Sequence, residues 1–304
     1  MKVLVTGGAG FIGSHTVDKL IAQGAKVLVV DNLSTGKEEN LNPAAEFVRL
    51  DVITEQLSEI FARFSPEYVI HLAAQVSVAR STENPVLDST TNIVGAVNVL
   101  ENCRRFGVKK VVYSSSAAVY GNPDEIIVSE TTPTVPASFY GISKLTPESY
   151  FKVFYNLYGL KHTILRYANI YGPRQDALGE GGVISIFATR ILAGQAPTIF
   201  GDGEQTRDFV YVGDIANANI KALTGGDLMT LNVGTGNRIS VNQLFTIMKE
   251  ITGASFGPQY SEARPGDVRH SCMDNRKIIE HLNWRPQVSL QEGLANTLEF
   301  YRNI

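Results

Sequence analysis

This chain of 304 residues has few cysteines, no excess of basic residues and no long apolar run. Its 2 cysteines, Cys103 and Cys272, are too few for a disulfide framework or a zinc site, so we expect no metal. The net charge of −3 argues against nucleic acid as the main partner. No apolar run is long enough to span a membrane, and no secretory leader precedes the first predicted strand. We therefore expect a cytoplasmic protein with no membrane partner.

Short β-branched segments alternate with longer segments of helical periodicity over the first half of the chain. This alternation is typical of an α/β fold with a doubly wound parallel sheet, as in Rossmann-like domains. The predicted strands cover residues 2–6, 26–30, 47–49, 68–72, 110–114 and 163–166. Helices are predicted over residues 11–23 and 84–106, through Leu57 and Phe61, and after Ser138, where Pro147 predicts a kink.

The alternation is less regular in the second half of the chain. Helices are predicted over 183–192, 214–223, 241–251 and 290–301, strands over 198–200, 209–212 and 231–233, and loops over 172–182 and 257–267. We expect residues 1–168 to form a dinucleotide-binding domain, to which residues 206–235 return. Residues 169–205 and 236–304 would form a smaller substrate-binding region over the carboxyl edge of the sheet, with the site between the two.

A glycine-rich turn joins the first predicted strand to the first predicted helix. Gly7, Gly10 and Gly13 would allow a tight turn, close approach to a pyrophosphate and close packing of the helix on the strand. Asp31 ends the second strand, where a carboxylate accepts hydrogen bonds from a ribose and repels a 2′-phosphate. This pattern favours NAD over NADP, although Lys37 lies nearby. Asp51 follows the third strand, where it either caps a turn or binds the adenine amino group.

Tyr140 and Lys144 lie four residues apart, so they share one face of a helix. An ammonium near a phenol favours the phenolate, which would give a proton acceptor. With 12 tyrosines and 27 basic residues, chance alone supplies about one such pair, and Tyr260 with Arg264 is a second match. Serines at 114–116 follow the fifth strand. They are either turn formers or hydroxyl donors directed toward the same pocket.

Taken together, the motifs at residues 6–13, 31–36, 71–74, 114–121, 140–144, 166–172, 207–212 and 264–268 resemble those of the extended short-chain dehydrogenase/reductase family. The resemblance covers nearly the whole chain and is greatest for the members that invert C4 of UDP-hexoses. It implies transient oxidation of the sugar to a 4-keto sugar, with NAD as a retained cofactor. Ser116, Tyr140 and Lys144 would be the catalytic residues.

The same resemblance implies two sets of binding residues. Those implied for the cofactor are Gly7, Gly10, Phe11, Ile12, Gly13, Asp31, Asn32, Ser34, Thr35, Gly36, Asp51, Val52, Leu72, Ala73, Ala74, Asn92, Ser114, Tyr140, Lys144 and Tyr167. Those implied for a UDP-sugar are Ser116, Tyr140, Asn169, Val183, Thr198, Phe200, Arg207, Arg264, Asp267 and Ser271. Members of the family are commonly homodimers, and we expect a dimer through the helix over 84–106 and the Tyr140 helix.

Three positions depart from patterns found in the family. Ala118 stands where UDP-glucuronate decarboxylases carry an acid, which disfavours decarboxylation, and Val76 replaces a lysine that some epimerases place on the cofactor. Ser271 stands at a position that gates the sugar pocket by size, so N-acetylated sugars are also expected to enter. The alternatives are an epimerase or reductase for another nucleotide sugar, such as UDP-glucuronate or a deoxythymidine sugar, and a non-catalytic nucleotide-sensing member.

Overall fold

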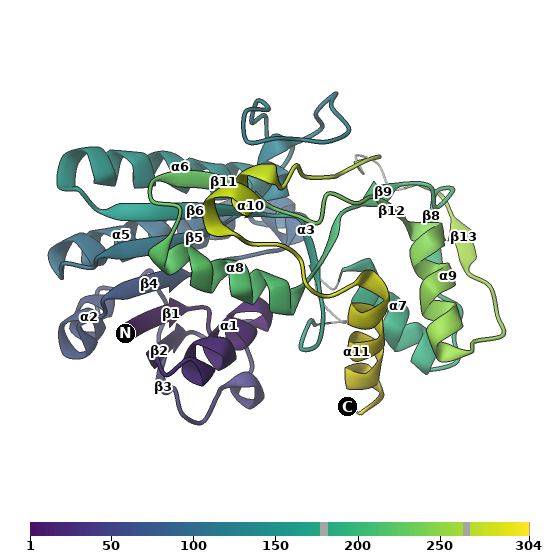
Figure 1. Ribbon diagram of the computed structural model, residues 1–304, viewed down its shortest axis with the longest axis horizontal. Helices are drawn as coiled ribbons and strands as arrows, with labels where there is room; N and C mark the ends of the chain where they lie inside the picture. Colours follow the sequence, from purple (N-terminus) through teal and green to yellow (C-terminus); the bar gives the residue numbers. More distant parts are fainter. Residues whose placement is uncertain (177–181, 264–267, 304) are drawn as a thin grey trace.

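The computed structural model describes residues 1–176, 182–263 and 268–303. A seven-stranded sheet lies at its centre, in the order β11-β6-β5-β4-β1-β2-β3, and every neighbouring pair is parallel (Figure 1). The strands are β1 (Lys2–Thr6), β2 (Lys26–Asp31), β3 (Glu46–Arg49), β4 (Tyr68–His71), β5 (Lys110–Ser116), β6 (Lys161–Tyr167) and β11 (Met229–Val233). The α/β doubly wound prediction is confirmed.

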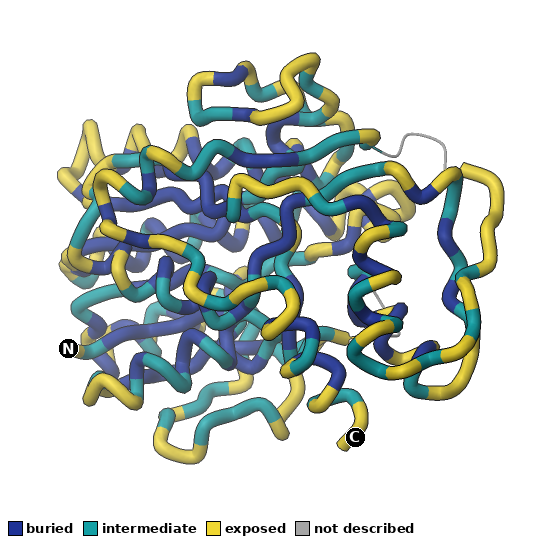
Figure 2. The backbone as a smooth tube through the Cα atoms, turned by 45° about the vertical axis from the view of Figure 1, so that its right-hand side comes forward, coloured by how far each residue is buried: buried dark blue, intermediate teal, exposed yellow. Residues whose placement is uncertain are grey.

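Helices cover both faces of this sheet. One face packs against α1 (Phe11–Ala22), α8 (Val212–Thr224) and α10 (Arg276–Leu282), and the other against α2 (Leu57–Phe64), α5 (Gly95–Arg105) and α6 (Phe139–Tyr158). Successive residues of β1 alternate between the faces: Val3 and Val5 lie in the first core and Leu4 lies in the second. The inner strands β1, β2, β4, β5 and β6 are accordingly buried on both sides, whereas no residue of the edge strand β3 is buried (Figure 2).

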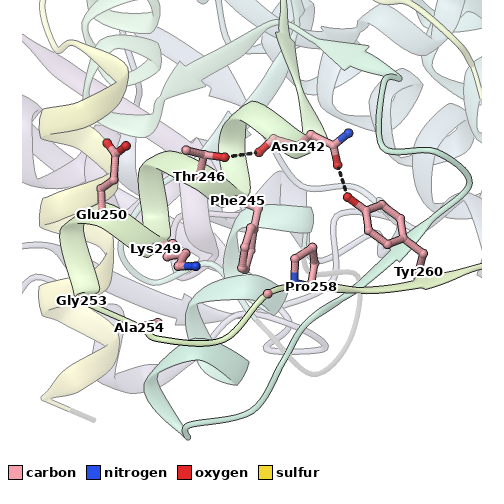
Figure 3. Close-up of a pocket in the computed structure, with 10 residues that line it drawn as sticks. Asn242, Phe245, Thr246, Lys249, Glu250, Gly253, Ala254, Pro258 and Tyr260 are labelled. Atoms are coloured by element: carbon pink, nitrogen blue, oxygen red, sulfur yellow. Dashed lines mark hydrogen bonds between the residues drawn. The ribbon is translucent and has the colours of Figure 1, made fainter.

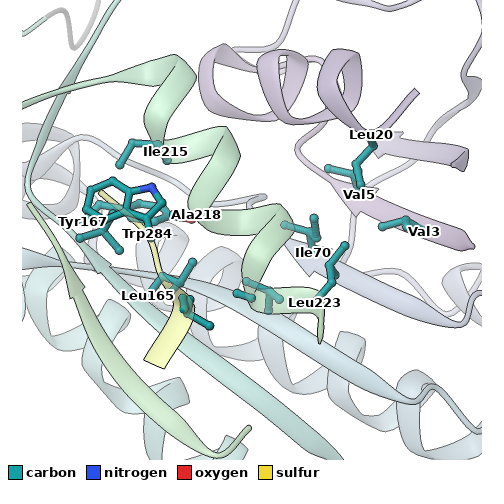
Figure 4. Close-up of a cluster of buried hydrophobic side chains, with 14 of the residues drawn as sticks. Val3, Val5, Leu20, Ile70, Leu165, Tyr167, Ile215, Ala218, Leu223 and Trp284 are labelled. Carbon is teal, nitrogen blue, oxygen red and sulfur yellow. The ribbon is translucent and has the colours of Figure 1, made fainter. Parts of the chain in front are cut away.

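The first core also includes a residue from far along the chain. Trp284 is 1% exposed and packs near Tyr167, Ile215 and Ala218 (Figure 4). Its indole N–H donates to the carbonyl of Asp214 at 2.9 Å. This part of residues 236–304 therefore packs with the sheet, whereas the predicted division placed it in the substrate-binding region. The division into two regions stays a prediction.

A second group of elements lies to one side of the sheet (Figure 1). Here α7 (Val183–Leu192), α9 (Val241–Thr252) and α11 (Leu290–Arg302) share a core with β8 (Thr198–Phe200), which pairs with β13 (Gln259–Ser261). Two short sheets connect this group to the main sheet. They are formed by β7 (Asn169–Tyr171) with β10 (Phe209–Tyr211), and by β9 (Thr206–Arg207) with β12 (Ile239–Ser240).

Several predicted elements differ from the structure. The loop predicted over 257–267 is wrong in part, since β13 occupies it, and residues 264–267 lie outside the described residues. The single helix predicted over 84–106 is α4 (Pro85–Ser89), a π-helical turn η2 (Thr90–Val94) and α5, preceded by α3 (Val78–Glu83). The helix α10 and the short helices η1 (Glu38–Asn40) and η3 (Ala117–Tyr120) were not predicted. Helix α6 continues through Pro147.

None of the helices in the described part of the chain is both long enough and apolar enough to cross a membrane.

Candidate active site

The glycine turn after β1 is tightly packed at two positions. Gly7 has a φ of +70°, and a Cβ added there would lie 2.7 Å from the amide nitrogen of Ala73. A Cβ on Gly13 would lie 2.0 Å from the carbonyl oxygen of Gly7. Only glycine fits such contacts. Helix α1 begins at Phe11 with no side-chain cap from Gly10, so its first amides remain available to an anion such as a pyrophosphate.

Asp31 lies beside this turn at the end of β2. Its carboxylate accepts from the amides of Ala9 at 3.0 Å and Leu33 at 2.8 Å. Burial raises the pKa of Asp31, and the two amide bonds oppose that rise. A Cβ on Gly36 would lie 2.9 Å from both carboxylate oxygens, so the 31–36 loop folds closely over the acid. Asp31 is thus held at the edge of the sheet where a ribose would lie.

Asp51 serves as a turn cap in this structure. Its carboxylate accepts from the amide of Ile53 at 3.2 Å and from the side chain of Asn32 at 2.7 Å. The capping role left open by the sequence is therefore present, and contact with adenine stays a prediction. The neighbouring Val52 is buried, and its carbonyl accepts from Asn98 at 2.6 Å.

Ser116 and Tyr140 meet where β5 ends and α6 begins. Burial raises the pKa of the Tyr140 phenol, its hydrogen bond with the Ser116 side chain opposes that rise, and the charge of Asp88 adds to it. The close approach depends on Gly141, because a Cβ there would lie 2.6 Å from the carbonyl oxygen of Ala118. The sequence-predicted pair of hydroxyls is therefore brought together.

Lys144 lies one turn further along α6 and is 4% exposed. Its ammonium donates to Ser114 Oγ at 3.4 Å and lies 5.0 Å from the centre of the Tyr113 ring. Burial lowers the pKa of Lys144 to about 7, while the carboxylates of Asp88 and Glu148 raise it. The structure thus collects Ser114, Ser116, Tyr140 and Lys144 at one edge of the sheet.

A buried polar network that the sequence reasoning missed supports this helix. Asp88, 1% exposed, accepts from the side chains of Gln75 at 2.8 Å and Asn92 at 3.2 Å. Asn92 also donates to Ser143 Oγ at 2.9 Å, and the Ser143 hydroxyl donates to the carbonyl of Tyr140. The Asn92 side chain is therefore already bonded within the chain, and its predicted role as a cofactor contact stays a prediction.

The remaining cofactor positions divide into two groups. The amides of Leu72 and Ala73 bond Thr6 beside the glycine turn, and Ala74, Ser34 and Thr35 lie in the loops at the same edge. Tyr167 differs, because its side chain lies in the first core and its hydroxyl donates to Asn219 Oδ1 at 2.5 Å. A contact between the Tyr167 side chain and the cofactor is thus not supported. If Tyr167 contacts the cofactor, it does so through its backbone. Ile12 also packs against the core.

The predicted sugar-nucleotide residues lie on the short sheets. Asn169 is exposed on β7, and its amide donates to the carbonyl of Asp208 at 3.0 Å, next to Arg207 on β9. The amide of Ser271 donates to the carbonyl of Thr206 at 3.1 Å, so Ser271 lies beside the same strand. Val183 begins α7, and Thr198 and Phe200 lie on β8. Arg264 and Asp267 lie outside the described residues.

Asp208 holds these segments together and was not singled out from the sequence. It is fully buried, and its carboxylate accepts from the amides of Thr235 at 2.8 Å and Met273 at 3.2 Å. It thereby joins β9, the segment after β11 and the segment that carries Ser271. The signal in the sequence is the position of Asp208 directly before the apolar strand that begins at Phe209. An acid buried beside such a strand needs amide or cationic partners, which predicts a structural role.

A cavity of about 550 Å³ lies elsewhere, between α9 and β13 (Figure 3). Phe245, Lys249, Pro258 and Tyr260 are among its lining residues, and the Tyr260 hydroxyl donates to Asn242 Oδ1 at 3.0 Å. None of the predicted site residues lines it. We therefore assign the site to the sheet edge.

The fold and this edge define a class: a Rossmann-type dinucleotide-binding protein with a serine, a tyrosine and a lysine beside the cofactor turn. Residues 3–234 match the NAD dependent epimerase/dehydratase family, and the chain belongs to that family. A UDP-glucose 4-epimerase of Mycolicibacterium smegmatis is 46% identical over 100% of this chain and 99% of its own length.

Two solved structures are similar over their whole length. A UDP-glucose 4-epimerase from Thermotoga maritima with UDP-glucose has a TM-score of 0.98 and 51% identity, and covers 100% of this chain and 99% of its own. A UDP-glucose 4-epimerase from Thermus thermophilus in complex with NAD has a TM-score of 0.93 and 44% identity, and covers 99% of each chain. The family predicted from the sequence is confirmed.

Proposed function

We propose that this chain is a NAD-dependent epimerase that inverts C4 of a UDP-hexose, with UDP-glucose and UDP-galactose as its substrate pair. The observation that carries the proposal is the approach of Ser116 to the Tyr140 phenol, one helical turn from Lys144, whose ammonium donates to Ser114 Oγ at 3.4 Å. Relatives that match nearly the whole chain bear the name UDP-glucose 4-epimerase, and one of them was solved with UDP-glucose.

NAD fits the residues at the sheet edge. The space at Gly7 and Gly13 admits no side chain, and Asp31 is fixed beside it, as a pyrophosphate and a ribose require. The chemistry that NAD held by these residues would supply is reversible hydride transfer at C4 of the sugar, with return of the hydride to the opposite face of the 4-keto sugar. A 2′-phosphate would meet the Asp31 carboxylate, which favours NAD over NADP.

The side chains would move the proton that accompanies this hydride. As a phenolate, Tyr140 accepts the proton of the 4-hydroxyl, and Ser116 orients that hydroxyl through its own hydrogen bond. Because burial raises the pKa of Tyr140, the phenolate needs positive charge nearby, and the Lys144 ammonium would supply it. The proton returns from Tyr140 when C4 is reduced again, so acid and base are regenerated.

The substrate's diphosphate would lie against the short sheets. Arg207 and the exposed Asn169 supply a guanidinium and an amide there, with Arg264 and Asp267 proposed as further contacts. Ser271, beside β9, is small enough to leave room for an N-acetyl group, so UDP-N-acetylglucosamine and its C4 epimer are proposed as a second pair.

The decisive test replaces Tyr140 with Phe. The variant should lose at least about a hundredfold in kcat with UDP-galactose, because it has no proton acceptor. Tyr260→Phe, at a tyrosine that is 59% exposed and lines the cavity away from the site, is the control and should keep its rate within about twofold. A loss below about tenfold for Tyr140→Phe would exclude the mechanism.

A substrate panel then tests the sugar. The wild-type protein is incubated with UDP-galactose, UDP-N-acetylgalactosamine and UDP-galacturonate, and the products are identified by NMR. We expect UDP-glucose without turnover of added NAD. If only the acid sugar reacts, the chain is an epimerase of the UDP-glucuronate type, the alternative raised by the sequence. If NAD binds but no sugar reacts, it is a non-catalytic member.

We also propose that the enzyme is a homodimer in the cytoplasm. Apolar side chains stay exposed on the helices α4, η2 and α6, which lie side by side: Val86 is 72% exposed, Val94 53% and Leu157 66%. A second copy would cover this face. Both cysteines are free and buried, as suits a reducing compartment.

Leu157→Glu tests the dimer. We expect sedimentation to show two copies for the wild type and one for the variant, because a buried charge would oppose the contact. Leu228→Glu, at a leucine that is 40% exposed elsewhere, should leave the dimer intact. A monomeric wild type would contradict this assignment of the face.

A further inference from the structure

Helix α6 carries a second buried ionisable residue, one turn beyond Lys144. Glu148 is 2% exposed and accepts from two nitrogens of the Arg166 guanidinium on β6, at 2.9 Å from Nε and 2.6 Å from Nη2. The Arg166 side chain is 7% exposed. A buried ion pair costs desolvation that an apolar pair of similar volume avoids, so stability alone is a poor reason for its presence. Its surroundings point to another reason.

The Glu148 carboxylate also binds β5 between the two serines of the site. The Ser115 hydroxyl donates to Glu148 Oε1 at 2.6 Å. Successive residues of a strand point to opposite sides, so Ser114 and Ser116 share one side and Ser115 takes the other. Ser114 accepts from Lys144 at 3.4 Å, and Ser116 lies close to the Tyr140 phenol. The Ser115 contact therefore fixes the register of both serines against the helix.

Arg166 fixes the chain on the far side of Ser116. Its third nitrogen, Nη1, donates to the Tyr120 hydroxyl at 2.9 Å, and Tyr120 lies on η3, the helical turn directly after Ser116. The Tyr120 hydroxyl donates in turn to Asn232 Oδ1 at 2.7 Å. Ser116 is thus bracketed by two segments that are both bonded to the Glu148–Arg166 pair.

Glu148 also contributes charge near Lys144. No carboxylate among the described residues forms an ion pair with the Lys144 ammonium at 4.0 Å or less; the carboxylates of Asp88 and Glu148 act on it from further away. The ionisable groups that face Lys144 come from four elements: His71 on β4, Asp88 on α4, Tyr113 on β5, and Tyr140 and Glu148 on α6.

We propose that Glu148 and Arg166 are positioning residues of the epimerase site: they hold Ser114 and Ser116 in register with Lys144 and Tyr140, and the Glu148 carboxylate supports the positive charge on Lys144. This inference rests on the proposed function for its kinetic consequence. The effect of Glu148 on the protonation of Lys144 does not depend on that function, and it can be measured without any sugar.

The test compares three variants with the wild type. Glu148→Gln keeps an oxygen that accepts from Ser115 but removes the charge, and Glu148→Gln with Arg166→Gln removes both buried charges so that neither is left unpaired. Lys110→Met is the control, because it breaks the ion pair of the buried Lys110 with the exposed Asp227 at the opposite end of β5. Melting temperature and bound NAD are measured first, so that kinetics are read only on folded protein.

We expect Glu148→Gln to lower kcat about tenfold with UDP-galactose and to change KM by less than about twofold. Because the lost carboxylate raised the pKa of Lys144, the alkaline limb of kcat/KM should move to lower pH. The double variant should keep that acidward shift, and Lys110→Met should not show it. A double variant with the wild-type pH profile would show that the shift in Glu148→Gln comes from the unpaired Arg166 charge and not from the lost carboxylate. That result would overturn the proposal.

The charge on Lys144 gives a readout independent of turnover. Titration of ¹³C-labelled lysine side chains by NMR, with Lys144→Met to assign the signal, should give a lower Lys144 pKa in Glu148→Gln than in the wild type. That shift in a protein inactive on every UDP-sugar would support the positioning role and refute the proposed function. An unmoved Lys144 pKa and unchanged kcat in an active enzyme would refute the positioning role alone.

Discussion

Gly141→Ala distinguishes the effect of helix propensity on the stability of the protein from the effect of close packing between α6 and η3. Gly141 lies in the first turn of α6, and the amide of Gly141 donates to the capping side chain of Ser138 at 3.0 Å. Helix propensity alone predicts that alanine stabilises the protein by up to about 1 kcal/mol. The tertiary structure predicts the opposite, because the new methyl would lie 2.6 Å from the carbonyl oxygen of Ala118 and 3.0 Å from the Pro136 side chain.

The loss of stability in Gly141→Ala can be estimated from the atoms that the new methyl group would displace. A contact of 2.6 Å has to open by several tenths of an ångström, and backbone is in the way on the Ala118 side. Overpacking of this kind costs about 1–3 kcal/mol, so we expect a net loss of stability of about 1–2 kcal/mol. The amide of Ala118 donates to Ser116 Oγ at 3.2 Å, so the shift displaces the partner of Tyr140. A displacement of that order should lower kcat about tenfold.

The assay is urea unfolding together with kcat on UDP-galactose. Gly257→Ala is the control, since a Cβ there meets nothing within 4 Å, and it should leave both quantities unchanged. If Gly141→Ala were as stable as the wild type or more so, with an unchanged kcat, the close packing of α6 on η3 would not position Tyr140.

Two further predictions concern the cofactor turn and acid stability. Gly13→Ala places a methyl 2.0 Å from the Gly7 carbonyl oxygen, so NAD should no longer bind in a fluorescence titration; full retention of NAD would contradict the role of the turn. Burial lowers the pKa of His162 from 6.5 to about 4, so the unfolded state binds the extra proton between these values, and the free energy of unfolding falls as the pH drops through them. His162→Phe should remove about 1.4 kcal/mol per pH unit from that slope, measured by urea unfolding at several pH values, and an unchanged slope would show that His162 is not buried uncharged.

Strands with local signals were predicted well. The glycine turn, Asp31 and the apolar strands of the main sheet are each encoded within a few residues, because backbone conformation and two-sided burial impose their own patterns. The apolar periodicity of residues 84–106 was misleading in one respect. Asn84 precedes Pro85, which disfavours helical backbone at Asn84, and its side chain instead caps α4 by accepting from Leu87 at 3.0 Å. That Asn-Pro signal was available in the sequence.

Other elements depend on partners that are far away in the chain. The exposed strand β13 has no alternating pattern of its own and exists because it pairs with β8 some sixty residues earlier. Asp208 and Asp88 are ordinary acids in the sequence, and only their burial among amide donors gives them a structural role. Burial of this kind is a tertiary property, which local periodicity cannot reveal.

The serines at the end of β5 can be related to α6 by combining the two-residue period of a strand with the 3.6-residue period of a helix. Strand alternation places Ser114 and Ser116 on one side and Ser115 on the other, while the spacing of α6 places Tyr140, Lys144 and Glu148 along one stripe. Ser115 lies on the α6 side of the strand with Tyr113 and bonds Glu148, whereas Lys144 reaches Ser114, and Tyr140 approaches Ser116, around the end of the strand. A glutamate on a helix usually faces solvent, so the helical spacing alone gives Glu148 no role at the site. In the structure Glu148 lies four residues beyond the buried Lys144 and is itself buried, so it requires a cation, and Arg166 on the adjacent strand provides one.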